Sequence, residues 1–259
     1  IRPRDHKLIQ IYNYKKKNNK LWCTFSHDQI DLNFKVPLVL IEFIEIVLLL
    51  LSKGVTTFRL DAVAFIWKKN GTSCVNLPET HEIVKLLRLI VNYINPHALI
   101  VTETNLPRKE KLSYVGNNDE ANWIYNFPLP PLILYTFLFE DSSKISGWSK
   151  SMPPAQINNA YLNFIASHDG IGMRPVEGIL DNIILDKLFK RVKKNGGKFS
   201  FRKVETKNKV YEVNITLFDA LKRTDFDKDG IFAVERYIAA NSILLALELS
   251  LIHISEPTR

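Results

Sequence analysis

The sequence contains few cysteines and no apolar run long enough to cross a membrane. Only two of its 259 residues are cysteine, Cys23 and Cys74, and they do not form a CxxC pair. Two such thiols exclude a disulfide framework. The longest apolar stretch, 38–51, covers 14 residues and is interrupted by Glu42 and Glu45. A bilayer span needs about 18 consecutive apolar residues, so we expect no membrane-spanning segment.

We expect neither end of this sequence to be a natural terminus. The first residues, IRPR, lack a starting Met and are not followed by an apolar core. We therefore see no signal peptide and expect the natural N-terminus to be missing. The last eleven residues, LSLIHISEPTR (249–259), resemble the translation of a transposase adapter used in sequencing libraries. We expect them not to be native, and the natural sequence to stop near Glu248.

Positive charge is in excess, but it is scattered. The net charge of +8 could indicate an anionic partner such as phosphate or nucleic acid. The lysines of 15–17 and 193–194 have no interleaved aromatic residues and no nucleic-acid motif nearby. We interpret them as a solvated surface and expect no nucleic-acid partner.

One segment imitates a calcium-binding loop. Residues 225–230 read DFDKDG, but Arg236 stands where a calcium loop places its bidentate Glu. The histidines show no metal-ligand spacing. We therefore expect no metal site.

Apolar strands and helices alternate through most of the chain. Continuous apolar strands that alternate with helices indicate a parallel sheet covered by helices. The segments 2–35 and 181–235 look irregular, with weak strand patterns. We expect helices over 38–51, 78–95 and 129–139, and strands over 55–60, 98–102, 123–127 and 161–166.

Three carboxylates follow the ends of these strands. Asp61 and Glu103 come after neighbouring strands, which lie about 4.8 Å apart in a sheet. Retaining cleavage of a glycosidic bond needs two carboxyl groups about 5 Å apart. Arg59 shares a strand face with Asp61 and could orient it. Asp169 could stabilise positive charge on a sugar ring, and His168 could donate to a sugar hydroxyl. Each residue could instead be a turn, cap or surface residue, so they do not by themselves define the reaction.

Four segments carry a family resemblance. FRLDAVAFIWKKNGTSC (58–74), VTETN (101–105) and FIASHDGIG (164–172) resemble, in order, the nucleophile, acid/base and third-carboxylate regions of the α-amylase superfamily, glycoside hydrolase family thirteen. SHDQIDLNF (26–34) resembles a short segment at the end of that family's second domain. Three catalytic regions in order form a far stronger signal than any one motif.

The resemblance implies a fold and a set of roles. The fold is a partial (β/α)8 TIM barrel, about strands four to seven, over 37–248, preceded by the end of an inserted second domain over 1–36. Asp61 becomes the nucleophile, Glu103 the general acid/base and Asp169 the transition-state stabiliser. Arg59 and His168 become subsite residues around the glucosyl unit. A half barrel leaves open sheet edges, so we expect the chain alone to be poorly soluble and inactive.

Other segments indicate a branch of this superfamily. NFPLPPL (126–132), SHDGIGMRP (167–175) and YEVNITLFDAL (211–221) resemble the sucrose-phosphorylase branch, which includes glucosylglycerate phosphorylases. Sucrose phosphorylases proper tend to have Gln where Glu212 stands, so the resemblance leans toward the glucosylglycerate type. The nucleophile region also resembles amylosucrases, which tend to carry SHDDIG in place of SHDGIG.

This branch implies an α-glucoside and inorganic phosphate as substrates, no cofactor and a cytoplasmic location. Arg174 and Tyr211 are the candidates for holding phosphate, because an anion beside two carboxylates needs compensating donors and charge. An amylosucrase-like transglucosylase or an α-glucoside hydrolase is the alternative. A non-enzymatic barrel relative is a further alternative, and the presence of all three carboxylates argues against it.

Overall fold

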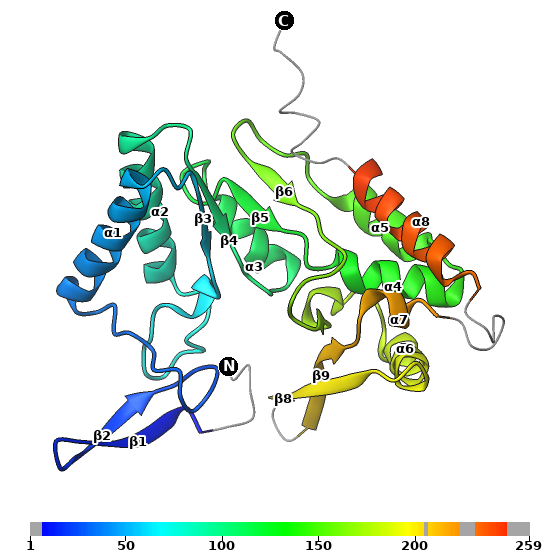
Figure 1. Ribbon diagram of the computed structural model, residues 1–259, viewed down its shortest axis with the longest axis horizontal. Coiled ribbons are helices and arrows are strands. Elements are labelled where there is room, and N and C mark those ends of the chain that lie inside the picture. The colour runs from blue at the N-terminus through cyan, green and yellow to red at the C-terminus, as the bar shows by residue number, and fades with distance from the viewer. Residues whose placement is uncertain (1–6, 205–206, 223–230, 248–259) are drawn as a thin grey trace, which may run out of the picture. The chain divides into compact units, whose positions relative to one another are not determined.

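The computed structural model describes residues 7–204, 207–222 and 231–247 (Figure 1). The calcium-like segment 225–230 and the adapter-like tail 249–259 lie outside these residues. The chain divides into two compact units, one made of 1–104, 112–123 and 201–209, the other of 105–111, 124–200 and 210–259. No helix in the described part is both long and apolar enough to cross a membrane.

The first unit begins with a β-hairpin. Strands β1 (Ile9–Tyr14) and β2 (Lys17–Trp22) pair antiparallel, with Tyr14 opposite Lys17. The two turn residues, Lys15 and Lys16, have φ of 50° and 62°, as a tight type I′ hairpin requires. The expectation that 2–35 is irregular was therefore wrong for this hairpin. Its sequence lacks the Asn-Gly signal, and two lysines adopt the left-handed conformation instead.

The rest of the first unit follows the expected alternation of helices and strands. Helices α1 and α2 each start with a proline in the first turn, where the missing N–H costs nothing. Val47, Phe58 and Ile100 form part of a buried cluster together with α2. The elements are α1 (Pro37–Ser52), β3 (Thr57–Leu60), α2 (Pro78–Ile94) and β4 (Leu99–Thr102), with short 3-10 helices η1 (Val63–Phe65) and η2 (Ser113–Val115).

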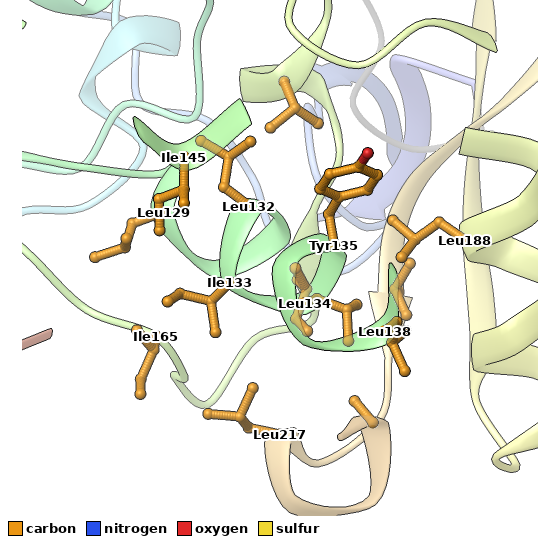
Figure 2. Packing of buried hydrophobic residues seen from close by; sticks show 14 of the residues in the cluster. Leu129, Leu132, Ile133, Leu134, Tyr135, Leu138, Ile145, Ile165, Leu188 and Leu217 are labelled. Carbon is orange, nitrogen blue, oxygen red and sulfur yellow. The ribbon is translucent and has the colours of Figure 1, made fainter. Parts of the chain in front are cut away.

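The second unit is built around helix α4 (Leu129–Phe139). This helix is apolar around most of its circumference, and eight of its eleven residues are buried. Figure 2 shows its leucines and Ile133 in one buried cluster with Leu188 and Leu217. The other elements include α3 (Arg108–Leu112), β5 (Trp123–Tyr125), α5 (Ser143–Ser151), β6 (Ala160–Leu162), β7 (Ile171–Gly172), η3 (Arg174–Val176), α7 (Leu217–Ala220) and α8 (Ala233–Ala246).

Where the structure describes it, the segment 181–235 is more regular than its sequence suggests. Helix α6 (Asn182–Lys194) is capped by Asp181, whose carboxylate accepts from the Ile184 backbone nitrogen at 2.8 Å. Strands β8 (Lys198–Val204) and β9 (Lys207–Asn214) follow, and the strand order in this sheet is β7-β9-β8. The prediction of weak strand structure here was wrong, because frequent Lys and Asn hide the strand pattern.

The expected strands at 55–60, 98–102, 123–127 and 161–166 are all present, and each is shorter than predicted. They form one sheet in the order β3-β4-β5-β6, which is also their order along the chain. Strands β3 and β4 run parallel. This succession of strands with intervening helices is that of a partial (β/α)8 barrel.

Candidate active site

Asp61 and Glu103 occupy matching positions at the ends of two paired strands. In the parallel register of β3 and β4, Leu60 lies opposite Thr102. The backbone nitrogen of Glu103 donates to the Leu60 carbonyl at 3.0 Å. Each carboxylate is thus the first residue beyond the paired segment, at the carboxyl edge where active sites of parallel α/β folds lie. The sequence-based expectation that these two strand ends are neighbours is confirmed.

Arg59 binds the candidate nucleophile directly. One terminal nitrogen of its guanidinium lies 2.5 Å from Asp61 Oδ1. The contact follows from the period of two along a strand, which places both residues on the same face. The Arg59 and Asp61 side chains are 35% and 73% exposed, so the pair contributes modestly to stability. Its main effect is to hold the orientation of the carboxylate.

The turn after Asp61 reaches the candidate acid/base. Ala62 adopts a left-handed conformation, with φ 46° and ψ 32°, which is uncommon for a residue with a side chain. Its backbone N–H donates to Glu103 Oε2 at 2.9 Å. Such backbone strain costs of order 1–3 kcal/mol and is often found at functional sites. This hydrogen bond therefore links the turn that carries the candidate nucleophile to the carboxylate of the candidate acid/base.

Asp169 and His168 belong to the second compact unit. Their side chains are 57% and 77% exposed, and His168 Nε2 lies 3.3 Å from Asp169 Oδ2. The Ser167 hydroxyl accepts a hydrogen bond from the Asp169 backbone nitrogen at 3.2 Å. The imidazole and the carboxylate can thus act together on a bound polar group.

The glycines that follow Asp169 leave no room for side chains. A Cβ at Gly170 would lie 2.5 Å from Asn214 Oδ1 and 3.1 Å from the Val213 carbonyl. A Cβ at Gly172 would lie 2.6 Å from the Asn105 amide nitrogen. The carboxylate loop is therefore packed directly against β9, and an aspartate in place of Gly170 would collide with that strand.

Arg174 and Tyr211, the candidate phosphate ligands, are close along the β7–β9 ladder. The backbone nitrogen of Met173 donates to the Tyr211 carbonyl at 3.0 Å. Both side chains are buried, each 8% exposed. A terminal nitrogen of Arg174 lies 3.8 Å from Glu110 Oε2. A phosphate bound to Arg174 would therefore compete with the Glu110 carboxylate for the positive charge of the guanidinium.

One buried polar cluster has no counterpart in the sequence analysis. Lys111 is fully buried, and its ammonium donates to Asn126 Oδ1 at 2.8 Å. The Asn126 amide donates in turn to Asn163 Oδ1 at 2.5 Å. Lys111 lies in the run RKEK (108–111), which looks like solvated surface, so no local signal indicated its burial.

The described residues contain no group of three or more His, Cys, Asp or Glu side chains that could hold a metal. His81, on α2, pairs with the buried Glu120 at 2.7 Å and packs against the Tyr114 ring at 4.6 Å between centroids. Its surroundings are those of a partly buried, hydrogen-bonded histidine.

Comparisons with known proteins place this arrangement in a family. Residues 9–171 match the family "Alpha amylase, catalytic domain". The chain is 42% identical over 249 residues to glucosylglycerate phosphorylase from Allomeiothermus silvanus, covering 96% of this chain and 45% of that protein. It is 38% identical over 248 residues to glucosylglycerate phosphorylase from Escherichia coli, covering 95% and 44%. The chain thus spans less than half the length of these relatives.

The fold is also similar to that of a solved structure. The crystal structure of sucrose 6F-phosphate phosphorylase from Thermoanaerobacter thermosaccharolyticum matches with a TM-score of 0.78 and 23% identity, over 94% of this chain and 47% of that one. This likeness supports the partial-barrel architecture.

Proposed function

Because the chain belongs to the alpha-amylase catalytic-domain family, we propose that the protein carrying it is a retaining α-glucoside phosphorylase with Asp61 as nucleophile and Glu103 as general acid/base. The pairing of the β3 and β4 ends, with the Ala62 N–H on Glu103 Oε2, is the observation that carries this proposal. It puts two carboxylates at one sheet edge, as double displacement requires.

The reaction proceeds in two displacements. Asp61 attacks the anomeric carbon while Glu103 protonates the leaving oxygen, and the glycosidic bond breaks to give a β-glucosyl ester of Asp61. Glu103, now ionised, accepts a proton from the incoming phosphate, whose oxygen attacks the same carbon and releases Asp61. The products are α-glucose 1-phosphate and the free aglycone, with net retention.

The remaining site residues act on binding and charge. Arg59 keeps Asp61 oriented through their 2.5 Å contact. Asp169 stabilises the positive charge that develops on the sugar ring, and His168 donates to a sugar hydroxyl. Arg174 and Tyr211 provide charge and a hydroxyl for phosphate, with Glu110 balancing the arginine when phosphate is absent.

We infer glucosylglycerate as the donor in preference to sucrose or sucrose 6-phosphate. The relatives at 42% and 38% identity are both named glucosylglycerate phosphorylase. Glu212, on β9, stands where sucrose phosphorylases tend to have Gln, and its side chain is buried at 8% exposure. Use of inorganic phosphate suits a cytoplasmic enzyme.

An amylosucrase-like transglucosylase or a hydrolase is the second candidate, since the same covalent intermediate can react with a sugar or with water. The close packing at Gly170 argues against the amylosucrase type, because the aspartate of SHDDIG would not fit beside Asn214 and Val213.

The test measures glucose 1-phosphate from the protein that carries this chain, extended to the length of its relatives. Glucosylglycerate, sucrose and sucrose 6-phosphate are each supplied with and without phosphate. Phosphate-dependent glucose 1-phosphate from glucosylglycerate supports the proposal. Free glucose or glucan, formed equally without phosphate, would assign the protein to the hydrolase or amylosucrase type.

A further inference from the structure

Helix α3 carries a lysine that is fully buried. Lys111, on α3, follows Glu103 by eight residues in the sequence. Its side chain has no exposed surface. Full burial of lysine is rare unless its ammonium is held by specific partners, so this residue calls for a physical explanation.

The ammonium donates to one asparagine, which in turn donates to a second, and each asparagine directly follows a strand. Lys111 Nζ donates to Asn126 Oδ1 at 2.8 Å, and Asn126 Nδ2 donates to Asn163 Oδ1 at 2.5 Å. Asn126 is the first residue after β5, and Asn163 the first after β6. The Asn126 backbone nitrogen also donates to the Leu162 carbonyl at 2.9 Å. The three side chains thus fasten the carboxyl ends of both strands to α3.

Asn163 is also the last residue of this cluster before Asp169, six positions later. Residues 166–169 are exposed, whereas Asn163 and Ile165 before them are buried, so Asn163 is one of the buried residues that hold the start of the third carboxylate's segment. All of these residues belong to the same compact unit.

The environment of the amine is consistent with this role. Burial, aided by the charge of Arg108, lowers the pKa of Lys111 to about 7. The Tyr161 ring lies with its centroid 5.7 Å from Nζ. The neutral amine and the ammonium can both donate a hydrogen bond to Asn126. Lys111 can therefore be buried here without a carboxylate as its partner.

We propose that Lys111 is a positioning residue, which through Asn126 and Asn163 fixes the strand ends that set the location of the Asp169 loop. It touches no reacting atom and acts through the hydrogen-bonded asparagines. The inference rests on the proposed function, since it assigns Asp169 a part in glucosyl transfer.

The test compares Lys111→Met with wild type in the protein that carries this chain. Methionine fills a similar volume without a donor. We expect kcat, normalised to the folded fraction by circular dichroism, to fall roughly ten- to hundredfold, because small misplacements of a catalytic group have effects of this size. KM for the glucoside should change much less. Lys109→Met, which alters an exposed lysine two residues away on α3, is the matched control and should leave both parameters unchanged.

Two further variants separate positioning from stability alone. Asn126→Asp supplies a carboxylate to the amine, so it should raise the Lys111 pKa, observed by NMR of labelled lysine, and shift any inflection of the pH–kcat profile near pH 7 to higher pH. Asn163→Ala keeps the amine and its first acceptor but removes the link toward Asp169, and should lower kcat as Lys111→Met does. If Lys111→Met does not fold, Asn163→Ala decides.

An unchanged kcat in folded Lys111→Met or in Asn163→Ala overturns the proposal. Release of nitrophenol from 4-nitrophenyl α-glucoside, with water as acceptor, allows the same comparison without phosphate. A protein that cleaves this substrate but makes no glucose 1-phosphate would refute the phosphorylase assignment while leaving the role of Lys111 measurable.

Discussion

The Glu103 carboxylate accepts a hydrogen bond from the backbone nitrogen of Ala62 at 2.9 Å. Ala62 is the residue after Asp61, and its left-handed conformation directs this N–H toward Glu103. Oε2 of Glu103 acts as the acceptor in this bond. A change in the conformation of the turn after Asp61 would therefore also move the Glu103 carboxylate.

Glu103→Gln should retain the Ala62 hydrogen bond, because the amide oxygen accepts as the carboxylate does, and should lose proton transfer. We expect kcat with the natural glucoside to fall by about 10²–10⁴-fold. A 4-nitrophenyl leaving group needs little protonation, so its release in the first displacement should be affected much less. Pre-steady-state release of nitrophenol checks this, and an equal loss for both leaving groups would contradict the acid role.

Arg59→Gln should reduce kcat by roughly ten- to hundredfold through loss of orientation of Asp61. Stability should change little, because the 2.5 Å pair is partly exposed. Steady-state kinetics and thermal unfolding of the same preparation measure both effects. Arg191→Gln, on α6 of the other compact unit, is the control. A large drop in unfolding temperature with unchanged kcat would show that Arg59 is structural instead.

Gly172→Ala should lower the free energy of unfolding by about 1–3 kcal/mol, the usual cost of overpacking. The added methyl would lie 2.6 Å from the Asn105 amide nitrogen, and its other near contacts are also to Asn105. Adding Asn105→Ala to Gly172→Ala should therefore restore much of the lost free energy of unfolding. The effect of the double variant should then differ clearly from the sum of the two single effects.

Gly147→Ala serves as the control for that cycle. A Cβ at Gly147 meets nothing within 4 Å, and the residue lies in α5. It should stabilise the protein by roughly 0.5–1 kcal/mol. If the changes in unfolding free energy caused by Gly172→Ala and Asn105→Ala simply add, the methyl group at 172 does not clash with the Asn105 side chain, and this prediction is wrong.

Tyr135→Phe should flatten the dependence of stability on pH at both extremes. The Tyr135 hydroxyl donates to Asp141 Oδ2 at 2.6 Å. This bond, with those from Ser143, lowers the pKa of Asp141 to about 2, and it raises the pKa of Tyr135 to about 12.

The signs of the two contributions differ. Asp141 has a depressed pKa in the folded state, so its contribution is full above about pH 4 and is lost as the pH falls toward 2. Tyr135 has a raised pKa, so its contribution is full below about pH 10 and is lost as the pH rises toward 12. Urea midpoints of Tyr135→Phe and wild type should converge at both extremes. Tyr93→Phe, at a tyrosine 89% exposed, should show no such convergence.

The core of the candidate site could be predicted from the sequence because its signals are local. A β-rich run, VTTFRL, ends at Asp61 and an apolar run ends at Glu103, and a parallel sheet brings such strand ends to one edge. Arg59 follows from the strand period alone. These inferences need no knowledge of distant contacts.

The features that the sequence did not reveal depend on tertiary context. The β1–β2 turn uses Lys15 and Lys16 in a left-handed conformation, which residue preferences disfavour. Lys111 reads as part of a charged surface run, and only packing of α3 makes it buried. The steric need for Gly170 and Gly172 arises from β9 and Asn105, which are distant in sequence.

The most direct test of the central claim is mass spectrometry of the trapped glucosyl-enzyme. The protein that carries this chain is treated with an activated fluoroglucoside, which slows the second displacement, and is then digested at low pH. The account predicts one added fluoroglucosyl group on the peptide containing Asp61, none in Asp61→Asn, and loss of the label when phosphate is added. A label on another residue, or active protein that never becomes labelled, would contradict it.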